Sequence, residues 1–194
     1  MGQSSLIDVN DSVLIVIDVQ DFFLKQTADG QGFLEKINWI IDVAVRLGVP
    51  IVVTAENIPE FGTVPDELRK RLPTTTQVHD KMVFELAADA DVMQEVVSHG
   101  RQTAILVGMT TECCVSQSAL GLMDKGYRVV VLVDAVSAPE NSHELGLMRM
   151  RSAGVEFSCL KGIFYEWLRN VPATDAFMQQ HFNEIGLPKE LEPI

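Results

Sequence analysis

Residues 13–17 read VLIVI, five apolar side chains of which four are β-branched, and Asp18 follows them directly. The run does not alternate between polar and apolar residues, as a strand with one solvated face would. Continuous apolar strands are typical of a parallel sheet that is covered on both faces. Four further runs share the pattern and a weaker sixth candidate joins them: residues 50–55 (PIVVTA), 103–108 (TAILVG), 128–134 (RVVVLVD), 155–160 (VEFSCL) and, as the weaker one, 77–83 (QVHDKMV).

Helical patterns lie between these runs. One apolar stripe at helical spacing covers residues 33–44 and stops before Gly48, and a second covers residues 115–123 and stops at Gly126. A shorter helix is expected at residues 144–152. Strand and helix alternate along the chain, which predicts an α/β open sheet with right-handed crossovers.

The length of 194 residues predicts a single domain, residues 1–194, with residues 171–194 as a C-terminal tail. Residues 57–76 contain three prolines and a glycine and predict a long loop around one short helix, a type of loop that is often functional. The tail predicts a last helix near residues 175–185. That helix could form an interface with another subunit or cap the protein's own sheet, and the sequence favours neither.

Composition excludes several classes of protein. The 27 acidic residues outnumber the 15 Lys and Arg residues and leave a formal charge of −12, which argues against nucleic acid as a partner because phosphates need a basic surface. No apolar run is long enough to span a membrane, and no signal peptide is visible. Three cysteines, two of them adjacent, form neither a disulfide framework nor a zinc motif, so we expect a cytoplasmic protein. Glycine-rich phosphate-binding loops are also missing.

Ligands of open α/β sheets bind beyond the carboxyl ends of the strands. This rule selects Asp18, Glu56, Asp134 and residues 109–114, all expected directly after strands. A thiol in a first helical turn feels the positive end of the helix dipole, which lowers its pKa, so Cys113 or Cys114 could be a nucleophile. The alternative is that both are small buried hydrophobic residues, as free cysteines usually are. Taken alone, Asp18 would be a capping or turn residue, Lys81 a surface charge, and each of the four scattered histidines a surface or capping residue.

The ordered set of motifs resembles the isochorismatase-like cysteine hydrolase superfamily over about residues 13–168. An apolar strand ends in Asp-x-Gln with aromatic residues, a lysine stands shortly before a phenylalanine, and a segment from a glycine to Cys-Val follows strand four. The matching pieces are residues 17–23 (IDVQDFF), 81–84 (KMVF), 108–115 (GMTTECCV), 117–119 (QSA), 126–129 (GYRV), 134–137 (DAVS) and 149–155 (RMRSAGV).

The resemblance implies a three-layer, Rossmann-like fold with six mostly parallel strands in the order 3-2-1-4-5-6 and helices on both faces. It implies a catalytic triad of Asp18, Lys81 and Cys114, and selects Cys114 over Cys113 because valine follows the nucleophile in that family. In the family a cis peptide precedes the residue that matches Thr110, here the bond from Met109, and the N–H groups of Thr110 and Cys114 would hold the oxyanion. Gln20 and Phe23 are expected to contact the substrate.

Departures from the family pattern narrow the expected chemistry. Nicotinamidases carry an Asp-x-His metal site after the second strand, whereas residues 54–59 here read TAENIP and no histidine precedes His79, so we expect no metal and no other cofactor. The best fit is the metal-free branch with unassigned substrates. The leading hypothesis is hydrolysis of a C–N bond in a small carboxamide or ureide through a thioester. A vinyl-ether hydrolase acting on an isochorismate-like molecule and a non-catalytic binding member are the alternatives. The family also implies a homo-oligomer, a dimer or larger.

Overall fold

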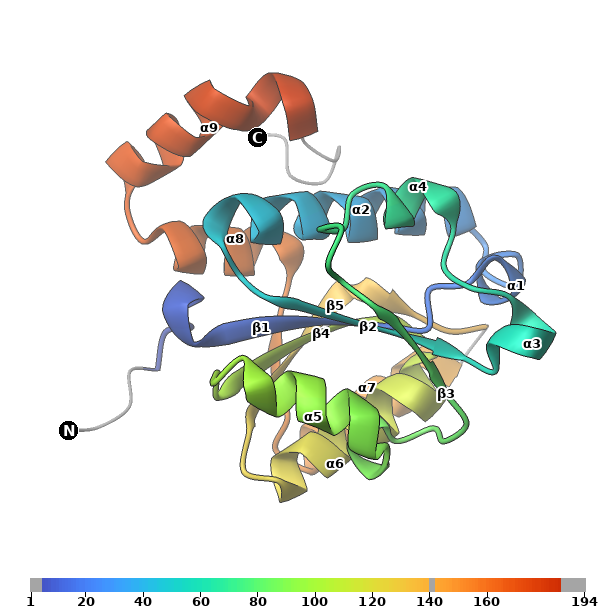
Figure 1. Cartoon of the computed structure of the whole chain (residues 1–194). Coiled ribbons are helices and arrows are strands. Elements are labelled where there is room, and N and C mark those ends of the chain that lie inside the picture. The colour runs from blue at the N-terminus through green and yellow to red at the C-terminus, as the bar shows by residue number, and fades with distance from the viewer. Residues whose placement is uncertain (1–4, 140–141, 186–194) are drawn as a thin grey trace.

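The computed structural model describes residues 5–139 and 142–185. Its centre is a six-stranded, fully parallel sheet in the order β3-β2-β1-β4-β5-β6 (Figure 1). This confirms the predicted fold class and strand order. The strands are β1 (Ser12–Ile17), β2 (Ile51–Glu56), β3 (Val78–Lys81), β4 (Thr103–Met109), β5 (Arg128–Ser137) and β6 (Glu156–Ser158).

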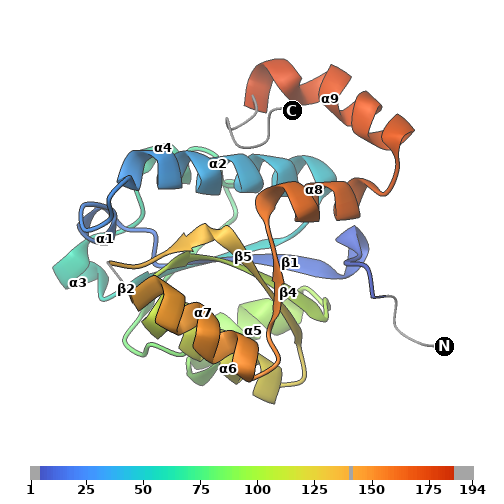
Figure 2. The same cartoon turned by 180° about the vertical axis from the view of Figure 1, so that it is seen from behind.

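Helices cover both faces of the sheet. The helices α2 (Gly30–Leu47), α8 (Leu160–Leu168) and α9 (Val171–Ile185) lie on one side, and α5 (Ala90–Ser98), α6 (Ser116–Asp124) and α7 (Ser142–Ser152) lie on the other (Figures 1 and 2). Strand β1 contributes side chains to the hydrophobic cores on both faces of the sheet, because successive side chains point to opposite faces. Leu14 and Val16 pack into the core under α2, whereas Ile15 and Ile17 pack into the core under α6. Burial on both faces explains why the strand is apolar throughout.

Helix ends follow the chemistry expected from the sequence. Gly48 adopts a left-handed φ of 71° at the C-terminus of α2, and Gly126 has a φ of 89° just beyond α6. At the start of α2, the Asp29 carboxylate accepts a hydrogen bond from the Gly32 N–H. The predicted ends of both helices are therefore confirmed.

Three segments differ from the sequence prediction. Strand β5 continues to Ser137, so Asp134 lies inside the strand instead of following it, and its carboxylate accepts a hydrogen bond from the Leu160 N–H at the start of α8. The proline-containing loop holds two short helices, α3 (Ile58–Phe61) and α4 (Asp66–Arg69), where one was expected. Helix α9 begins at Val171, earlier than predicted, and residues 186–194 of the tail lie outside the described residues.

Strands β1 and β4 are neighbours at the point where the strand order reverses, and Gly108 brings them together. Its φ of 124° is unfavourable for any residue with a side chain, and a Cβ there would lie 2.0 Å from the Ile17 carbonyl oxygen. This contact fixes the carboxyl end of β1 against the carboxyl end of β4, and the residues that follow each strand therefore share one crevice.

Among the described helices, none combines the length and the apolar character needed to cross a bilayer.

Candidate active site

Asp18, Lys81 and Cys114 meet beyond the carboxyl ends of β1, β3 and β4. The Lys81 ammonium lies 2.6 Å from Asp18 Oδ2, and it donates to Cys114 Sγ at 3.5 Å. Asp18 and Lys81 are fully buried and Cys114 is 3% exposed. The structure thus brings together the three residues that the resemblance selected, from positions up to 96 residues apart (114 − 18).

Neighbouring groups hold the buried charges in place. The Thr54 hydroxyl on β2 donates to Asp18 Oδ1 at 2.8 Å, and the Asp18 backbone N–H donates to the Thr54 carbonyl at 3.1 Å. The Lys81 ammonium also donates to the Val83 carbonyl at 3.1 Å. A buried charge is stable only when it is paired and hydrogen-bonded, and these contacts meet that requirement for Asp18 and Lys81.

The segment that contains Cys114 is a π-helical turn, η3 (Thr111–Val115), between β4 and α6. The peptide bond from Met109 to Thr110 is cis, as the resemblance implies. The Thr110 carbonyl accepts hydrogen bonds from the N–H groups of Cys113 and Val115, both at 3.1 Å.

Helix α7 supports this turn from outside. The Thr111 hydroxyl and His143 Nδ1 are 2.9 Å apart, and a Cβ at Gly146 would lie 2.7 Å from the Glu112 backbone nitrogen. From the sequence, His143 was expected only at the surface or in a cap. No spacing rule connects it with Thr111, because only the packing of α7 on η3 brings the two side chains together.

Glu56 is a site residue that was selected from the sequence by its position but was assigned no role. It ends β2, its side chain is half-buried, and the Cys114 thiol donates to Glu56 Oε2 at 3.1 Å. The thiol therefore lies between two carboxylates, Asp18 and Glu56, with Lys81 beside it.

Burial dominates the protonation of the cluster. Desolvation raises the pKa of Asp18 although Lys81 acts in the opposite direction. Desolvation also raises the pKa of the Cys114 thiol, and the nearby Asp18 carboxylate raises it further. The pKa of Lys81 is raised because Asp18 and the neighbouring acidic groups outweigh the effect of burial, which alone would lower it. The lowered thiol pKa expected from the helix N-terminus is therefore wrong for Cys114.

The two residues expected to contact substrate have different surroundings. Gln20 is fully buried, and its side chain accepts a hydrogen bond from the Glu56 N–H at 2.8 Å and donates to the Glu56 carbonyl at 2.9 Å. Its amide also donates to the Gly62 carbonyl. Phe23 packs against the rings of Phe22 and Phe61, with centroid distances of 5.2 and 5.5 Å. Gln20 therefore fixes the end of β2, and Phe23 belongs to an aromatic cluster.

Oxygen and sulfur atoms of Asp18, Glu56 and Cys114 lie within 4.8 Å of one another, close enough to share a metal ion. The Lys81 ammonium already provides the positive charge there, because it contacts both Asp18 and Cys114. A divalent cation would have to displace it or accept its repulsion. The donor set therefore fits an ammonium better than a metal, and the absence of a catalytic metal stays a prediction.

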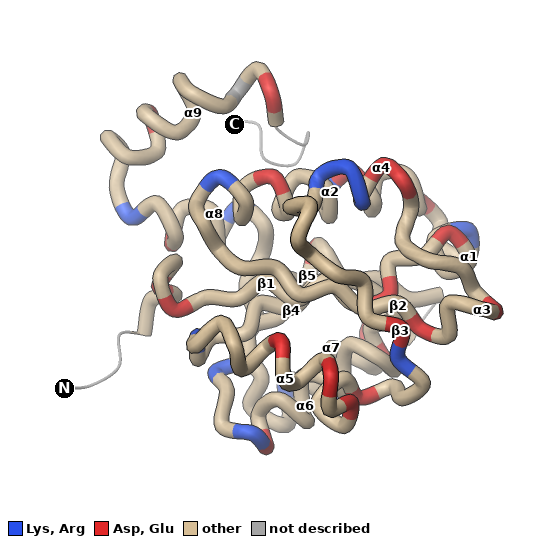
Figure 3. Tube along the Cα trace, viewed as in Figure 1, with Lys and Arg blue, Asp and Glu red and all other residues tan. Residues whose placement is uncertain are grey.

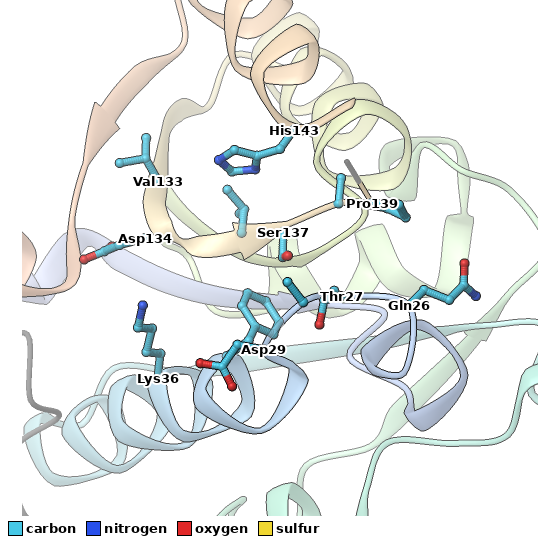
Figure 4. Close-up of a pocket in the computed structure, with 13 residues that line it drawn as sticks. Gln26, Thr27, Asp29, Lys36, Val133, Asp134, Ser137, Pro139 and His143 are labelled. Atoms are coloured by element: carbon cyan, nitrogen blue, oxygen red, sulfur yellow. The ribbon is translucent and has the colours of Figure 1, made fainter. Parts of the chain in front are cut away.

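A separate cavity of about 490 Å³ lies between the α1–α2 region, where α1 is Asp21–Leu24, and the end of β5 (Figure 4). Its lining includes Thr27, Asp29, Asp134 and His143 but none of the residues of the Asp18–Lys81–Cys114 cluster. Thr27, Asp29 and Asp134 already hydrogen-bond to backbone groups nearby. His143 links this cavity to η3 through its contact with Thr111.

Known proteins resemble this chain over most of its length. A family model described as the isochorismatase domain matches residues 12–161. A curated relative, the secreted isochorismatase effector Isc1 of Phytophthora sojae, is 32% identical over 164 residues, which cover 80% of this chain and 76% of the relative.

Solved structures share the fold. The protein YcaC from Pseudomonas aeruginosa, solved with hexane-2,5-diol and covalent acrylamide, has a TM-score of 0.83 at 20% identity and covers 95% of this chain and 96% of its own. The YcaC gene product of Escherichia coli, described as an octameric hydrolase of unknown specificity, has a TM-score of 0.83 at 21% identity, with 95% of each chain covered.

Proposed function

Because the chain belongs to the isochorismatase family, whose members are hydrolases, we propose that it is a metal-independent cysteine hydrolase that cleaves the C–N bond of a small carboxamide or ureide. The observation that supports this most directly is the position of Cys114 Sγ, 3.5 Å from the Lys81 ammonium and beside the buried Asp18 carboxylate. A nucleophile, an adjacent base and a third group that orients the base form the arrangement needed for covalent catalysis.

In the first half-reaction, Asp18 accepts the thiol proton and Cys114 Sγ attacks the substrate carbonyl carbon. The raised pKa of Cys114 means that the thiol is protonated before substrate binds, and the raised pKa of Asp18 makes that carboxylate a better proton acceptor than an exposed one. The N–H groups of Thr110 and Cys114 receive the oxyanion, and Lys81 balances the negative charge that moves from Asp18 to the sulfur.

The tetrahedral intermediate then collapses to complete the first half-reaction, and hydrolysis of the resulting thioester is the second. The C–N bond breaks, Asp18 returns its proton to the leaving nitrogen, and an acyl thioester remains on Cys114. Water then loses a proton to Asp18 and attacks the thioester carbon, which releases the acid product and restores the thiol as the proton returns to sulfur.

The variant Cys114→Ala tests this proposal. We expect turnover of any active amide or ureide to fall by at least about a thousandfold, because no covalent intermediate can form. Cys113→Ala is the matched control, since it removes the neighbouring thiol and keeps Cys114. Incubation of the wild-type protein with substrate should add the acyl mass to Cys114. Activity that survives Cys114→Ala would support the vinyl-ether hydrolase, and a chain without activity or adduct would support the non-catalytic alternative.

We further propose a homo-oligomer in a reducing, cytoplasmic compartment. The octameric E. coli relative of the same fold supports assembly, as do large apolar side chains that are exposed on this subunit, among them Met82, Phe84, Leu145 and Met148. The three free cysteines support a reducing environment, although the P. sojae relative is named as secreted. Light scattering gives the mass of the assembly, and a monomer at micromolar concentration would refute the homo-oligomer. Recovery of the protein in the cytosolic fraction tests the cytoplasmic location.

A further inference from the structure

We propose that Glu56 determines substrate specificity by accepting a hydrogen bond from the nitrogen of the bound amide or ureide, so that the site takes uncharged or cationic N–H donors and rejects carboxylates. The inference rests on the proposed function and adds to it a specificity residue, Glu56. The preference for uncharged or cationic N–H donors over carboxylates is called the charge rule below. Its basis is the carboxylate of Glu56, which lies 3.1 Å from the sulfur that would attack the substrate. A group so close to the nucleophile must also lie close to whatever the nucleophile attacks.

The charges around Cys114 do not cancel. Asp18 and Lys81 form a buried pair at 2.6 Å, which is neutral as a unit. Glu56 has no basic side chain within 4.0 Å in the part of the chain that the structure describes. One negative charge therefore remains beside the protonated thiol. Figure 3 shows acidic positions where β2, β3 and α3 meet, together with a basic position at the end of β3.

The hydrogen bonds also leave a position for the substrate. An ionised carboxylate can only accept hydrogen bonds, and the proton donor that Glu56 Oε2 has at present is the Cys114 thiol. When Asp18 takes the thiol proton, Glu56 loses this donor and faces a thiolate. An N–H group of the substrate would replace the donor. A substrate carboxylate would instead add another negative charge at the same place, which is costly in a partly buried site.

The backbone of Glu56 is held rigidly, as a recognition residue requires. Fully buried Gln20 bonds both its N–H and its carbonyl, at 2.8 and 2.9 Å. Gln20 is thus a positioning residue that acts through Glu56. From this fixed point the half-buried Glu56 side chain contacts the sulfur and remains partly exposed to solvent.

Two alkylating reagents of the same shape test the charge rule without a known substrate. Iodoacetamide carries a carboxamide where iodoacetate carries a carboxylate. We would measure the rate of modification of each cysteine by peptide mass spectrometry at pH 9, and use Cys159 of the same molecule as the internal reference. We expect the iodoacetamide-to-iodoacetate rate ratio at Cys114 to exceed the ratio at Cys159 by at least about tenfold.

Glu56→Gln keeps the shape and the acceptor oxygen but removes the charge, and it should bring the Cys114 ratio to within about threefold of the Cys159 ratio. Glu112→Gln is the matched control: it removes an exposed charge two residues from Cys114, and the ratio should not change. If Glu56 acted only as a proton acceptor for the thiol, the variant would change both rates equally and leave the ratio unaltered.

The outcomes separate the two proposals. Modification of Cys114 without preference for iodoacetamide, or a preference that Glu56→Gln leaves intact, would overturn the role of Glu56 and leave the cysteine hydrolase standing. Failure of both reagents to modify Cys114 while Cys159 reacts would overturn the charge rule, because a site that takes small N–H donors must admit iodoacetamide, and the acyl adduct on Cys114 tests the hydrolase separately. A preference that disappears in Glu56→Gln and persists in Glu112→Gln would support the charge rule.

Discussion

The Cys114 thiol is surrounded by groups that favour its neutral form. It is buried, Asp18 raises its pKa through its charge, and a hydrogen bond to Glu56 holds the proton on sulfur, whereas Lys81 alone opposes them. Many reactive cysteines are thiolates at neutral pH because a cation outweighs burial. Here the cation is already paired with Asp18 at 2.6 Å. In the proposed mechanism the thiolate is therefore formed during the reaction, by proton transfer, and is not present beforehand.

This argument predicts how the alkylation of Cys114 depends on pH. Because the pKa is raised above the ordinary thiol value of 9.0, the thiolate fraction is small at neutral pH, and the rate of iodoacetamide modification should still increase above pH 9. Asp18→Asn removes a negative neighbour that raises the pKa, so its rate profile should move to lower pH. Mass spectrometry of the Cys114 peptide gives both profiles. A rate already maximal below pH 7 would instead indicate a preformed thiolate.

The buried ion pair predicts a stability effect. Lys81→Met leaves Asp18 buried without its cation, and breaking such a pair costs about 3–5 kcal/mol of unfolding free energy at neutral pH. The variant should recover stability in acid, since a carboxyl whose folded pKa is raised loses stability as pH rises from its unfolded pKa of 3.8 through the folded value. Urea denaturation at pH 5 and pH 8 measures this. Lys70→Met, an exposed control, should change little at either pH.

The sequence predicted part of this site, and there is a physical reason why the remaining contacts could not be predicted. Asp18, Lys81 and Cys114 each lie at or beyond the end of a strand, and the topology of a parallel sheet places such residues at one edge. The ordered motifs then selected one cysteine of two. Glu56 and His143 were not assigned roles because their contacts, with Cys114 and Thr111, depend on side-chain packing between residues 58 and 32 positions apart in the chain. The thiol pKa was misjudged because a helix dipole can be inferred from sequence, whereas burial cannot.

At the scale of elements, the contact between β1 and β4 controls the geometry of the site. Gly108→Ala should lower the unfolding free energy by more than about 3 kcal/mol, because its Cβ would overlap the Ile17 carbonyl and φ is 124°. Gly126→Ala separates these causes, since Gly126 has a φ of 89° and a Cβ added there would meet no atom within 4 Å. Its cost should be about 1 kcal/mol, from conformation alone. Equal losses in urea denaturation would contradict a steric role for Gly108.

Elements were predicted best where the apolar pattern is long. The central strands β1, β2 and β4 and the long helix α2 lie where the sequence places them. The strands are apolar throughout because both of their faces are buried, and the helix has one apolar stripe because one side of it is buried. The π-helical turn at Thr111–Val115 was not predicted, since its residues carry no periodic signal. Strand β5 extends past Asp134: its pairing with β4 shifts register between Leu106 and Gly108 and then continues to Ser137. Such a shift depends on the neighbouring strand.

For the whole molecule, the sequence left open whether the last helix caps its own subunit or joins two subunits. In the structure, α9 packs on α8 and α2, on the side of these helices that faces away from the sheet (Figures 1 and 2). Its anchor is Phe177, which is 7% exposed and packs against the ring of Phe164 on α8 with a centroid distance of 5.5 Å. Arg46 of α2 adds an ion pair to Glu184 at 3.0 Å.

These contacts predict that α9 stabilises its own subunit. Phe177→Ala should lower the unfolding free energy by about 3 kcal/mol, because it opens a cavity between α8 and α9. Glu184→Gln should cost less than about 1 kcal/mol, since the Glu184 side chain in this ion pair is 65% exposed. Urea denaturation measures both, and light scattering of the folded variants should give the same assembly mass as the wild type. If Phe177→Ala instead dissociated the assembly without destabilising the subunit, the main contact of α9 would be with another subunit, because only an intermolecular role leaves the isolated fold unaffected.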